Sequence, residues 1–252
     1  WWSFRRGASD LKRLQLGLLT TVLSNLAPTE YGRTLGVRAG WCYHTFRERI
    51  PLNSYQDLLP FLARESGLLR QSVKVWEPTG GSTGGSKWIP WTSGLQAQFR
   101  KAIHVWIFEL FRRRPGLMRG RGYWQLTPKT TVRPPEWLAG QSTGFQSDGD
   151  YLGWLGRTLE RWVTVQIALQ RSEIWESTVE ALKEARDLTL ISCWSPSFLQ
   201  VLKQKMEERW GCWSPEEWWP DLQLVSCWTQ GPSAGYRPAI RNLFPAVEIQ
   251  GK

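Results

Sequence analysis

Residues 79–87 bring together residue types suited to binding an anion: four glycines, four hydroxyl side chains and, at the end, Lys87. Glycines let successive backbone N–H groups converge on an anion, because no Cβ atom obstructs the approach. The hydroxyl groups add hydrogen-bond donors, and the lysine adds a mobile charge that can follow the β- or γ-phosphate of a nucleotide. The stretch therefore predicts a phosphate-binding loop suited to a triphosphate. A flexible Gly/Ser hairpin without a ligand is the alternative.

The spacing excludes two familiar phosphate-binding motifs. A P-loop requires G-x-x-x-x-G-K-[ST], but Ser86 stands where the lysine should be and Trp88 follows Lys87. A dinucleotide fingerprint enters a helix, whereas residues 88–92 have the pattern of a strand. Since residues 72–78 also read as extended, we expect the loop to join two strands.

Hydrophobic periodicity and cap residues predict a mixed α/β fold around this loop. Helices are expected at residues 9–26, 55–65 (capped by Asn53 or Ser54), 94–114 (capped by Ser93), 172–187 (capped by Ser172), 195–211 and 233–244. Strands are expected at residues 72–78, 88–92, 122–128, 188–194, 222–228 and 246–251, and a polar loop at 141–153. Short apolar strands that alternate with helices indicate largely parallel sheets with flanking helices. No linker-like stretch marks a domain boundary.

The turns after two of these strands are candidate ligand sites. A Cys-Trp pair ends each strand, at residues 193–194 and 227–228, and a turn containing serine and proline follows each pair. In open α/β sheets ligands bind outside the carboxyl ends of the strands. We therefore expect both turns to face one crevice.

Composition indicates a globular protein that could bind an anionic ligand. The 252-residue chain carries a formal charge of +10, but this charge is scattered and the longest basic run is residues 112–114. Its four cysteines form no CxxC pair and only two histidines are present, which argues against zinc fingers and a disulfide-stapled scaffold. No apolar run is long enough to span a bilayer, and the amino terminus does not read as a signal peptide. A cytoplasmic location is therefore expected.

Tryptophan is unusually abundant, with 18 residues. Most stand where an α/β pattern requires a large apolar side chain, which predicts that they lie in or near the core. A surface rich in tryptophan could instead stack on sugars or on single-stranded nucleic acid.

The loop and its flanks resemble a known family. A strand, the pattern [TS]-G-[GS]-[ST]-[TS]-G-x-x-K and a second strand form the signature of adenylate-forming enzymes, and residues 73–92 are similar to it. The chain also resembles, nearly throughout and in order, the Gretchen Hagen three family of auxin-responsive acyl-acid amido synthetases, in its bacterial form. The further matches cover residues 95–103, 112–128, 144–153, 188–202 and 218–252 and, more loosely, residues 30–36 and 46–62.

This resemblance implies an adenylate-forming-enzyme-like fold and an ATP-dependent ligase. With Mg²⁺ present, the carboxylate of a small acid would attack the α-phosphate of ATP and pyrophosphate would leave. An amine or amino acid would then take the acyl group from the adenylate to form an amide. Lys87 is the implied catalytic residue, since its charge would stabilise the reacting phosphates. The implied phosphate contacts are Thr79, Gly80, Gly81, Ser82, Thr83, Gly84, Gly85, Ser86 and Lys87.

The same resemblance implies two further sites. Gly231 and Pro232 would lie against the adenine of ATP. Trp106, Phe108 and Trp194 would line the acyl pocket, with plain core packing as the alternative for each. The resemblance implies no nucleic-acid partner, and no metal-ligating residue is assigned.

The chain also departs from the family pattern. It ends at Lys252, before the Thr-Glu segment, the ribose-binding aspartate and the mobile carboxy-terminal domain that the family carries. Residues 1–252 are therefore expected to be an amino-terminal large-domain portion, with little or no activity alone. Trp88 and Trp91 stand where smaller or hydroxylated residues are usual and could crowd the loop. Two other classes stay open: a non-catalytic, basic, Trp-rich binder of nucleic acid or an anionic surface, and an inactive relic of the family.

Overall fold

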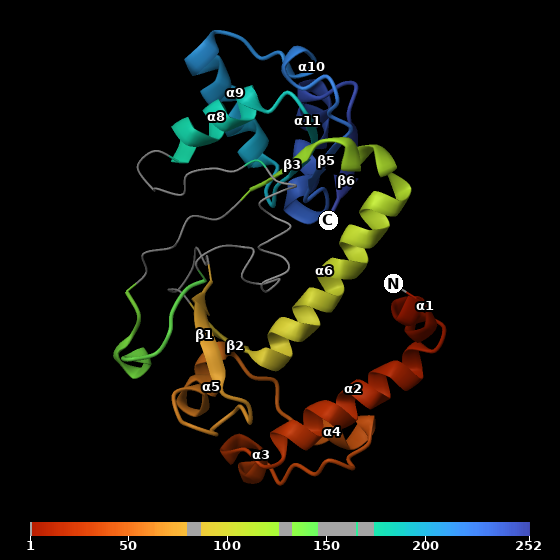
Figure 1. The fold of residues 1–252 in the computed structure, drawn as a ribbon. Coiled ribbons are helices and arrows are strands. Elements are labelled where there is room, and N and C mark those ends of the chain that lie inside the picture. Colours follow the sequence, from red (N-terminus) through yellow and green to blue (C-terminus); the bar gives the residue numbers. More distant parts are fainter. Residues whose placement is uncertain (1, 80–86, 126–132, 146–164, 166–173) are drawn as a thin grey trace. The chain divides into compact units, whose positions relative to one another are not determined.

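The computed structural model describes residues 2–79, 87–125, 133–145, 165 and 174–252 (Figure 1). The chain divides into two units. Unit 1 comprises residues 1–105 and 130–145, and unit 2 comprises residues 106–129 and 146–252. In the described part of the chain, no helix has both the length and the apolar character needed to cross a lipid bilayer.

Unit 1 combines helices with an antiparallel hairpin. Its helices are α1 (Trp2–Ala8), α2 (Leu11–Leu26), α3 (Glu30–Thr34), α4 (Tyr43–Arg49), α5 (Tyr55–Leu62), the first part of α6 (Ser93–Arg113) and the 3-10 turn η2 (Glu136–Leu138). The hairpin consists of β1 (Val73–Pro78) and β2 (Trp88–Thr92), which pair antiparallel. Trp76 and Trp88 of the hairpin form a buried cluster with Leu138, and this cluster is the core beneath the two strands.

Side-chain caps fix the starts of three helices in unit 1. Asp10 caps α2, and Thr29 caps α3 by accepting a hydrogen bond from a backbone N–H of the first turn. Ser54 and Asp57 form a reciprocal capping box at the start of α5. The expected helices at residues 9–26 and 55–65 are therefore confirmed, and Ser54 rather than Asn53 is the cap of the second.

Unit 2 is built on a four-stranded parallel sheet. Its strands are β3 (Arg121–Trp124), β4 (Leu188–Ser192), β5 (Leu224–Cys227) and β6 (Glu248–Gly251), in the order β3-β4-β5-β6. The helices are the second part of α6, α8 (Ile174–Glu184), α9 (Ser197–Trp210), α10 (Pro215–Trp218) and α11 (Arg237–Leu243), with the 3-10 turns η1 (Pro115–Arg119) and η3 (Gly231–Tyr236). The predicted α/β class with a largely parallel sheet is confirmed.

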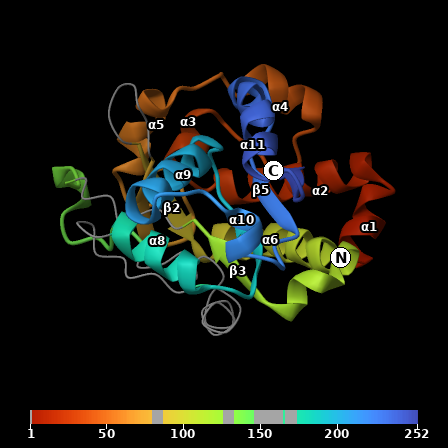
Figure 2. The same ribbon diagram turned by 90° about the horizontal axis from the view of Figure 1, so that it is seen from above.

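Helices cover both faces of this sheet. On one face Leu190 and Leu224 of the strands pack with Leu110 of α6. On the other face Ile191 and Val225 belong to a larger cluster that includes residues of α8, α9 and α11. Helices α8 and α9 lie side by side in both views (Figures 1 and 2). Every residue of β4 and β5 is buried, which explains why both read as continuous apolar runs in the sequence.

Most tryptophans of the described residues lie in the core or pack against it, as predicted. Trp76, Trp88, Trp218 and Trp219 are buried, and only Trp2, Trp194 and Trp228 among the described tryptophans are exposed. The remaining described ones are half-buried. This part of the surface therefore offers few rings for stacking on a sugar or a nucleobase.

One expected cap is wrong. Helix α6 begins at Ser93 itself, so the preceding residue, Thr92, takes the capping position. The Thr92 hydroxyl oxygen accepts a hydrogen bond from the Leu95 N–H at 3.2 Å. The expected cap Ser172, and residues 126–128 of the strand expected at 122–128, lie outside the described residues.

Candidate functional site

The two ends of the predicted phosphate loop are held together by hydrogen bonds. Pro78 at the end of β1 faces Trp88 at the start of β2. One step further, the Thr79 N–H donates to the Lys87 carbonyl at 2.8 Å, and the Lys87 N–H donates to the Thr79 side-chain oxygen at 3.2 Å. The prediction that the loop joins two strands is confirmed. Its inner residues, Gly80, Gly81, Ser82, Thr83, Gly84, Gly85 and Ser86, lie outside the described residues, so their phosphate contacts stay a prediction.

The Lys87 side chain is exposed. It forms no ion pair with any residue that the structure describes. Its ammonium group could therefore move to an incoming phosphate without first leaving a described carboxylate. A lysine ammonium is a compact point charge on a flexible stem, which suits it to following a phosphate that changes position.

A tyrosine from α5 fixes the second strand at the base of the loop. The Tyr55 hydroxyl accepts a hydrogen bond from the Trp88 N–H at 3.0 Å and donates one to the Trp88 carbonyl at 3.3 Å. Both contacts are part-buried, so water is a poor replacement for the hydroxyl. Sequence reasoning missed this contact, because the two residues are 33 positions apart and no local pattern joins them.

The edge of β1 that does not face β2 forms hydrogen bonds with residues 142–145. The Trp76 N–H donates to the Ser142 carbonyl, and the Gly144 N–H donates to the Trp76 carbonyl, each at 2.9 Å. The Phe145 N–H donates to the Glu77 carboxylate, also at 2.9 Å. An isolated two-stranded hairpin is only marginally stable in water. These contacts along β1, together with the Tyr55 hydrogen bonds to Trp88 of β2, hold both strands in place at the base of the loop.

The two tryptophans expected to crowd the loop are both engaged in packing. Trp88 is buried in the cluster with Trp76. The Trp91 ring lies edge-to-face on Phe99 and Phe145, with ring centroids 5.4 and 5.3 Å apart. Both rings therefore contribute to the packing of unit 1. Whether they restrict the loop depends on residues 80–86, which the described structure does not include.

In unit 2, polar and aromatic groups meet at the carboxyl ends of the strands. The Trp194 N–H, after β4, donates to the Gln125 side-chain oxygen at 3.3 Å, and the Trp228 N–H, after β5, donates to the Trp194 carbonyl at 2.9 Å. The Trp194 and Trp228 rings are 5.9 Å apart and 45% and 46% exposed. The two Cys-Trp turns therefore lie next to each other at one edge of the sheet, and the expectation that they face one crevice stays a prediction.

The side chain of one lysine lies near two of the three residues predicted for the acyl pocket. The Lys252 ammonium lies 4.8 Å from the centroid of the Trp194 ring and 5.6 Å from that of Trp106. Both distances are within the range of a cation–π interaction. Trp106 also packs edge-to-face on Trp124 of β3. The third residue, Phe108, is about half exposed on α6, and no distance connects it to this group.

The residues predicted to lie against adenine open the turn after β5. Gly231 and Pro232 are exposed and begin η3. Gly231 has a φ of 58°, a left-handed conformation that glycine adopts without steric cost. A backbone that turns here without a side chain leaves room for a flat ligand, and the turn lies at the carboxyl end of the sheet. Contact with adenine stays a prediction.

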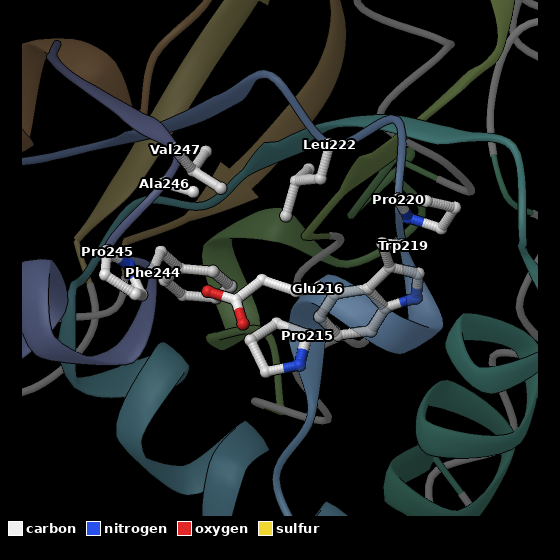
Figure 3. A pocket seen from close by; sticks show the side chains of 9 residues that line it. All are labelled: Pro215, Glu216, Trp219, Pro220, Leu222, Phe244, Pro245, Ala246 and Val247. Carbon is white, nitrogen blue, oxygen red and sulfur yellow. The ribbon is translucent and has the colours of Figure 1, made fainter.

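A small pocket lies at the opposite edge of the same sheet (Figure 3). It encloses about 160 Å³, and its lining residues are Pro215, Glu216, Trp219, Pro220, Leu222, Phe244, Pro245, Ala246 and Val247. Leu222 and Val247 precede β5 and β6, so the pocket belongs to the amino ends of these strands. None of the predicted site residues lines it.

Sequence reasoning missed three groups at these sites: Tyr55, Gln125 and the side chain of Lys252. The last two could have been found by one signal, since each follows the end of a parallel strand, where ligands of α/β sheets gather. No three His, Cys, Asp or Glu side chains among the described residues come together in a way that could hold a metal ion.

Fold and sequence together define an α/β protein that carries a glycine- and hydroxyl-rich loop on an antiparallel hairpin. The family model described as "GH3 family N-terminal domain" matches residues 3–212. The chain therefore belongs to the GH3 family, and the resemblance seen in the sequence is confirmed.

Two solved structures show the same fold over nearly the whole chain. The first, "AtGH3.15 acyl acid amido synthetase in complex with 2,4-DB", aligns with a TM-score of 0.77 and 15% identity over 95% of this chain and 52% of its own. The second, "GH3.15 acyl acid amido synthetase", gives a TM-score of 0.73 and 14% identity over 96% and 53%. The chain thus spans about half the length of these structures. No curated protein matches it.

Proposed function

We propose that the chain supplies the ATP-binding and acyl-binding portion of an acyl-acid amido synthetase, a ligase that joins a small carboxylic acid to an amine or amino acid. The observation that carries this proposal is membership of the GH3 family across residues 3–212, which include the loop. The hairpin supports it, since hydrogen bonds between Thr79 and Lys87 close the loop at its base.

The chemistry requires stabilisation of negative charge at phosphorus. Attack of a carboxylate on the α-phosphate of ATP brings two anions together, and negative charge builds up on the departing pyrophosphate. Backbone N–H groups and hydroxyls of residues 79–86, with the Lys87 ammonium, would hold the β- and γ-phosphates and stabilise that charge. The protein needs no covalent nucleophile, because the substrate carboxylate is the nucleophile.

The acid and the nucleotide base would bind at the carboxyl edge of the parallel sheet. Gly231 and Pro232 would lie against adenine, and the Trp106 and Trp194 rings would form one wall of the acyl pocket. Phe108 stays a candidate for the same wall. The Lys252 ammonium, between the two tryptophan rings, would attract the carboxylate of the acid.

Mg²⁺ would enter with the nucleotide. A magnesium ion in such a site is held largely by phosphate oxygens and water, with one or two protein carboxylates. The described residues provide no ready-made cluster for it. We therefore assign no magnesium ligand in this chain.

The loop can be tested directly by nucleotide binding. ATP should raise the melting temperature of the 252-residue chain, and Lys87→Ala and Gly84→Val should each reduce this increase while leaving the fold intact by circular dichroism. Lys101→Ala, which removes an exposed lysine of α6, is the matched control and should leave the increase unchanged. An unchanged increase in both loop variants would refute the phosphate site.

The reaction itself is tested by carboxylate-dependent exchange of pyrophosphate into ATP. The assay should use the longest natural protein that contains these 252 residues, with a panel of aromatic and aliphatic acids. Exchange that depends on one class of acid is expected. No exchange with any acid would favour the inactive relic, and salt-sensitive retention on DNA or RNA that is indifferent to ATP would favour the basic binding protein. We propose the cytoplasm as the location, where ATP is available.

A further inference from the structure

Two cysteines occupy matching positions on neighbouring parallel strands of unit 2. Ser192 of β4 is the register partner of Ser226 of β5, and Cys193 and Cys227 follow them. The Cys193 N–H continues the ladder by donating to the Ser226 carbonyl at 2.9 Å. Side chains of neighbouring strands that are in register project from the same face of a sheet. Both thiols accordingly belong to one hydrophobic cluster, and both cysteines are free.

The two thiols differ in acidity because they interact with each other. A hydrogen bond from the Cys193 thiol lowers the pKa of Cys227, and the Lys252 ammonium lowers it further, although burial opposes both effects. The same hydrogen bond and burial raise the pKa of Cys193. Since a thiolate is the nucleophilic form of cysteine, the directions of these pKa shifts favour Cys227 as the sulfur that reacts first and Cys193 as the one that resolves the product.

The usual spacing of neighbouring strands is compatible with a disulfide between the two residues. Neighbouring strands lie about 4.7–4.9 Å apart, and disulfides form between Cα atoms roughly 4.4–6.8 Å apart. The strands therefore need only a small adjustment. Cys227 is the last residue of β5, and Cys193 directly follows the end of β4. Both precede the exposed Trp194 and Trp228, at an end of the sheet, where local opening is easiest.

We propose that Cys193 and Cys227 form a redox-active pair, which hydrogen peroxide converts into a reversible cross-strand disulfide at the carboxyl edge of the parallel sheet. The Cys227 thiolate attacks one peroxide oxygen, the O–O bond breaks, and hydroxide leaves to become water by taking up a proton. The resulting sulfenic acid is attacked by the Cys193 sulfur, which loses its proton, and a second water leaves. Two thiols and one peroxide thus give one disulfide and two waters. A dithiol reverses the step by exchange and is itself oxidised.

The disulfide would affect the positions of the neighbouring tryptophan side chains. Trp194 and Trp228 follow the two cysteines directly, and the Trp228 N–H donates to the Trp194 carbonyl. A covalent link between the preceding residues fixes the spacing of the two turns. The proposal does not depend on the proposed function, since the thiol pair is defined by the sheet and not by any substrate.

The chain provides its own controls for the oxidation experiment. Cys42 and Cys212 are exposed, so the test uses the Cys42→Ser/Cys212→Ser background to remove competing thiols. The sequence contains two methionines, of which Met118 is 68% exposed and Met206 is 0% exposed, in the same cluster as the thiol pair. Oxidation of Met118 shows that peroxide has acted, and oxidation of Met206 shows that the core has opened.

The folded background protein is treated with increasing hydrogen peroxide and digested with trypsin without reduction. Trypsin cleaves at Lys203, Lys205 and Arg209, so Cys193 and Cys227 leave on separate peptides unless a disulfide joins them. The expected result is a linked peptide pair, two hydrogens lighter than the separate peptides, formed before Met206 sulfoxide is detected. Dithiothreitol should abolish the link.

Single variants assign the roles of the two sulfurs. In the same background, Cys193→Ser should leave Cys227 as a sulfenic acid that dimedone traps, whereas Cys227→Ser should leave Cys193 largely unreacted. Both variants should keep the far-ultraviolet circular dichroism of the parent. The proposal is overturned if Met118 is oxidised while no linked peptide forms, or if the link appears only in parallel with Met206 oxidation. It is also overturned if Cys193 and Cys227 react with peroxide independently and equally.

Discussion

At the scale of single residues, the part of the candidate site that could be predicted is the part that depends on composition. Four glycines and four hydroxyls before Lys87 are visible in any reading of the chain, because their effect is local. The Tyr55 contact with Trp88 and the position of Lys252 over Trp194 could not be predicted, since both depend on how distant segments meet. The residues that hold a site in place are therefore harder to find than those that form it.

Tyr55→Phe tests the contact that holds β2. The ring stays, but the part-buried Trp88 N–H and carbonyl lose their shared partner. Leaving such groups without a partner costs about 1–3 kcal/mol. We expect urea denaturation to show a decrease of that size in the free energy of unfolding. Tyr43→Phe, at an exposed tyrosine of α4, is the control and should be close to neutral. Equal effects of the two substitutions would contradict the role of Tyr55.

The pair formed by Arg121 and Asp187 makes a pH-dependent contribution at the start of the sheet. Arg121 donates to the Asp187 carboxylate through two nitrogens, at 2.6 and 3.0 Å. These hydrogen bonds lower the pKa of Asp187. Because the folded pKa lies below the unfolded one, the stabilisation is complete above the unfolded pKa, near 4. It is lost as the pH falls through the folded pKa.

Asp187→Asn should therefore lower stability at neutral pH and should do so less and less as the solution is acidified below about pH 4. Both side chains are partly exposed, so the effect at neutral pH should be at most about 1 kcal/mol. Thermal melts of the variant and the parent between neutral and acidic pH measure it. Asp221→Asn, at an exposed position without an ion pair among the described residues, is the control and should change the melting temperature little at neutral pH. A difference for Asp187→Asn that persists unchanged into acid would exclude this explanation.

At the scale of elements, the long helices and the buried strands could be predicted, and the short elements could not. Residues 188–194 and 222–228 read as strands because their apolar side chains are buried on both faces, as β4 and β5 show. Helices α3, α4 and α10 have no more than seven residues and give no periodic signal. Helices this short depend on tertiary packing rather than on their own propensity. The sheet order also could not be read from one sequence, since strand pairing is non-local.

At the start of α6 the residue that caps the helix differs from the one expected from the sequence. The sequence favours Ser93 as the cap, but the Thr92 hydroxyl oxygen accepts the hydrogen bond from Leu95. Thr92→Ala should therefore cost about 0.5–2 kcal/mol of stability. Ser93→Ala should be neutral or slightly stabilising, because this residue lies inside the helix, where alanine is preferred. Chemical denaturation of the two variants decides between the caps, and a larger loss for Ser93→Ala would show that the assignment is wrong.

At the scale of the whole molecule, the boundary between the two units gives no signal in the sequence. The chain first passes from unit 1 to unit 2 between residues 105 and 106, within α6. A boundary inside a continuous helix needs no glycine- or proline-rich linker, so composition does not change there. The expectation that residues 1–252 are the large-domain portion of an adenylate-forming enzyme stays a prediction. What the structure adds is that the loop base lies in unit 1 and the carboxyl edge of the parallel sheet in unit 2.

Two core substitutions test whether the units unfold separately. Leu23 in α2 of unit 1 and Leu199 in α9 of unit 2 both have 0% exposure, so replacing either by alanine should leave a cavity of similar kind. Such a cavity costs about 2–5 kcal/mol. Hydrogen exchange followed by mass spectrometry measures amide exchange separately for peptides from each unit. We expect Leu23→Ala to accelerate exchange of the slowest amides in α2 and the hairpin, while β4 and β5 stay protected.

Leu199→Ala should do the reverse, exposing β4 and β5 while α2 and the hairpin keep their protection. This follows because Leu199 belongs to the core cluster of unit 2 and Leu23 is a buried residue of unit 1, so the stability that each substitution costs should be lost mainly from its own unit. If either substitution accelerated the slowest amides of both units by the same factor, the chain would unfold as one cooperative body. In that event α6 would transmit the loss of stability from one unit to the other.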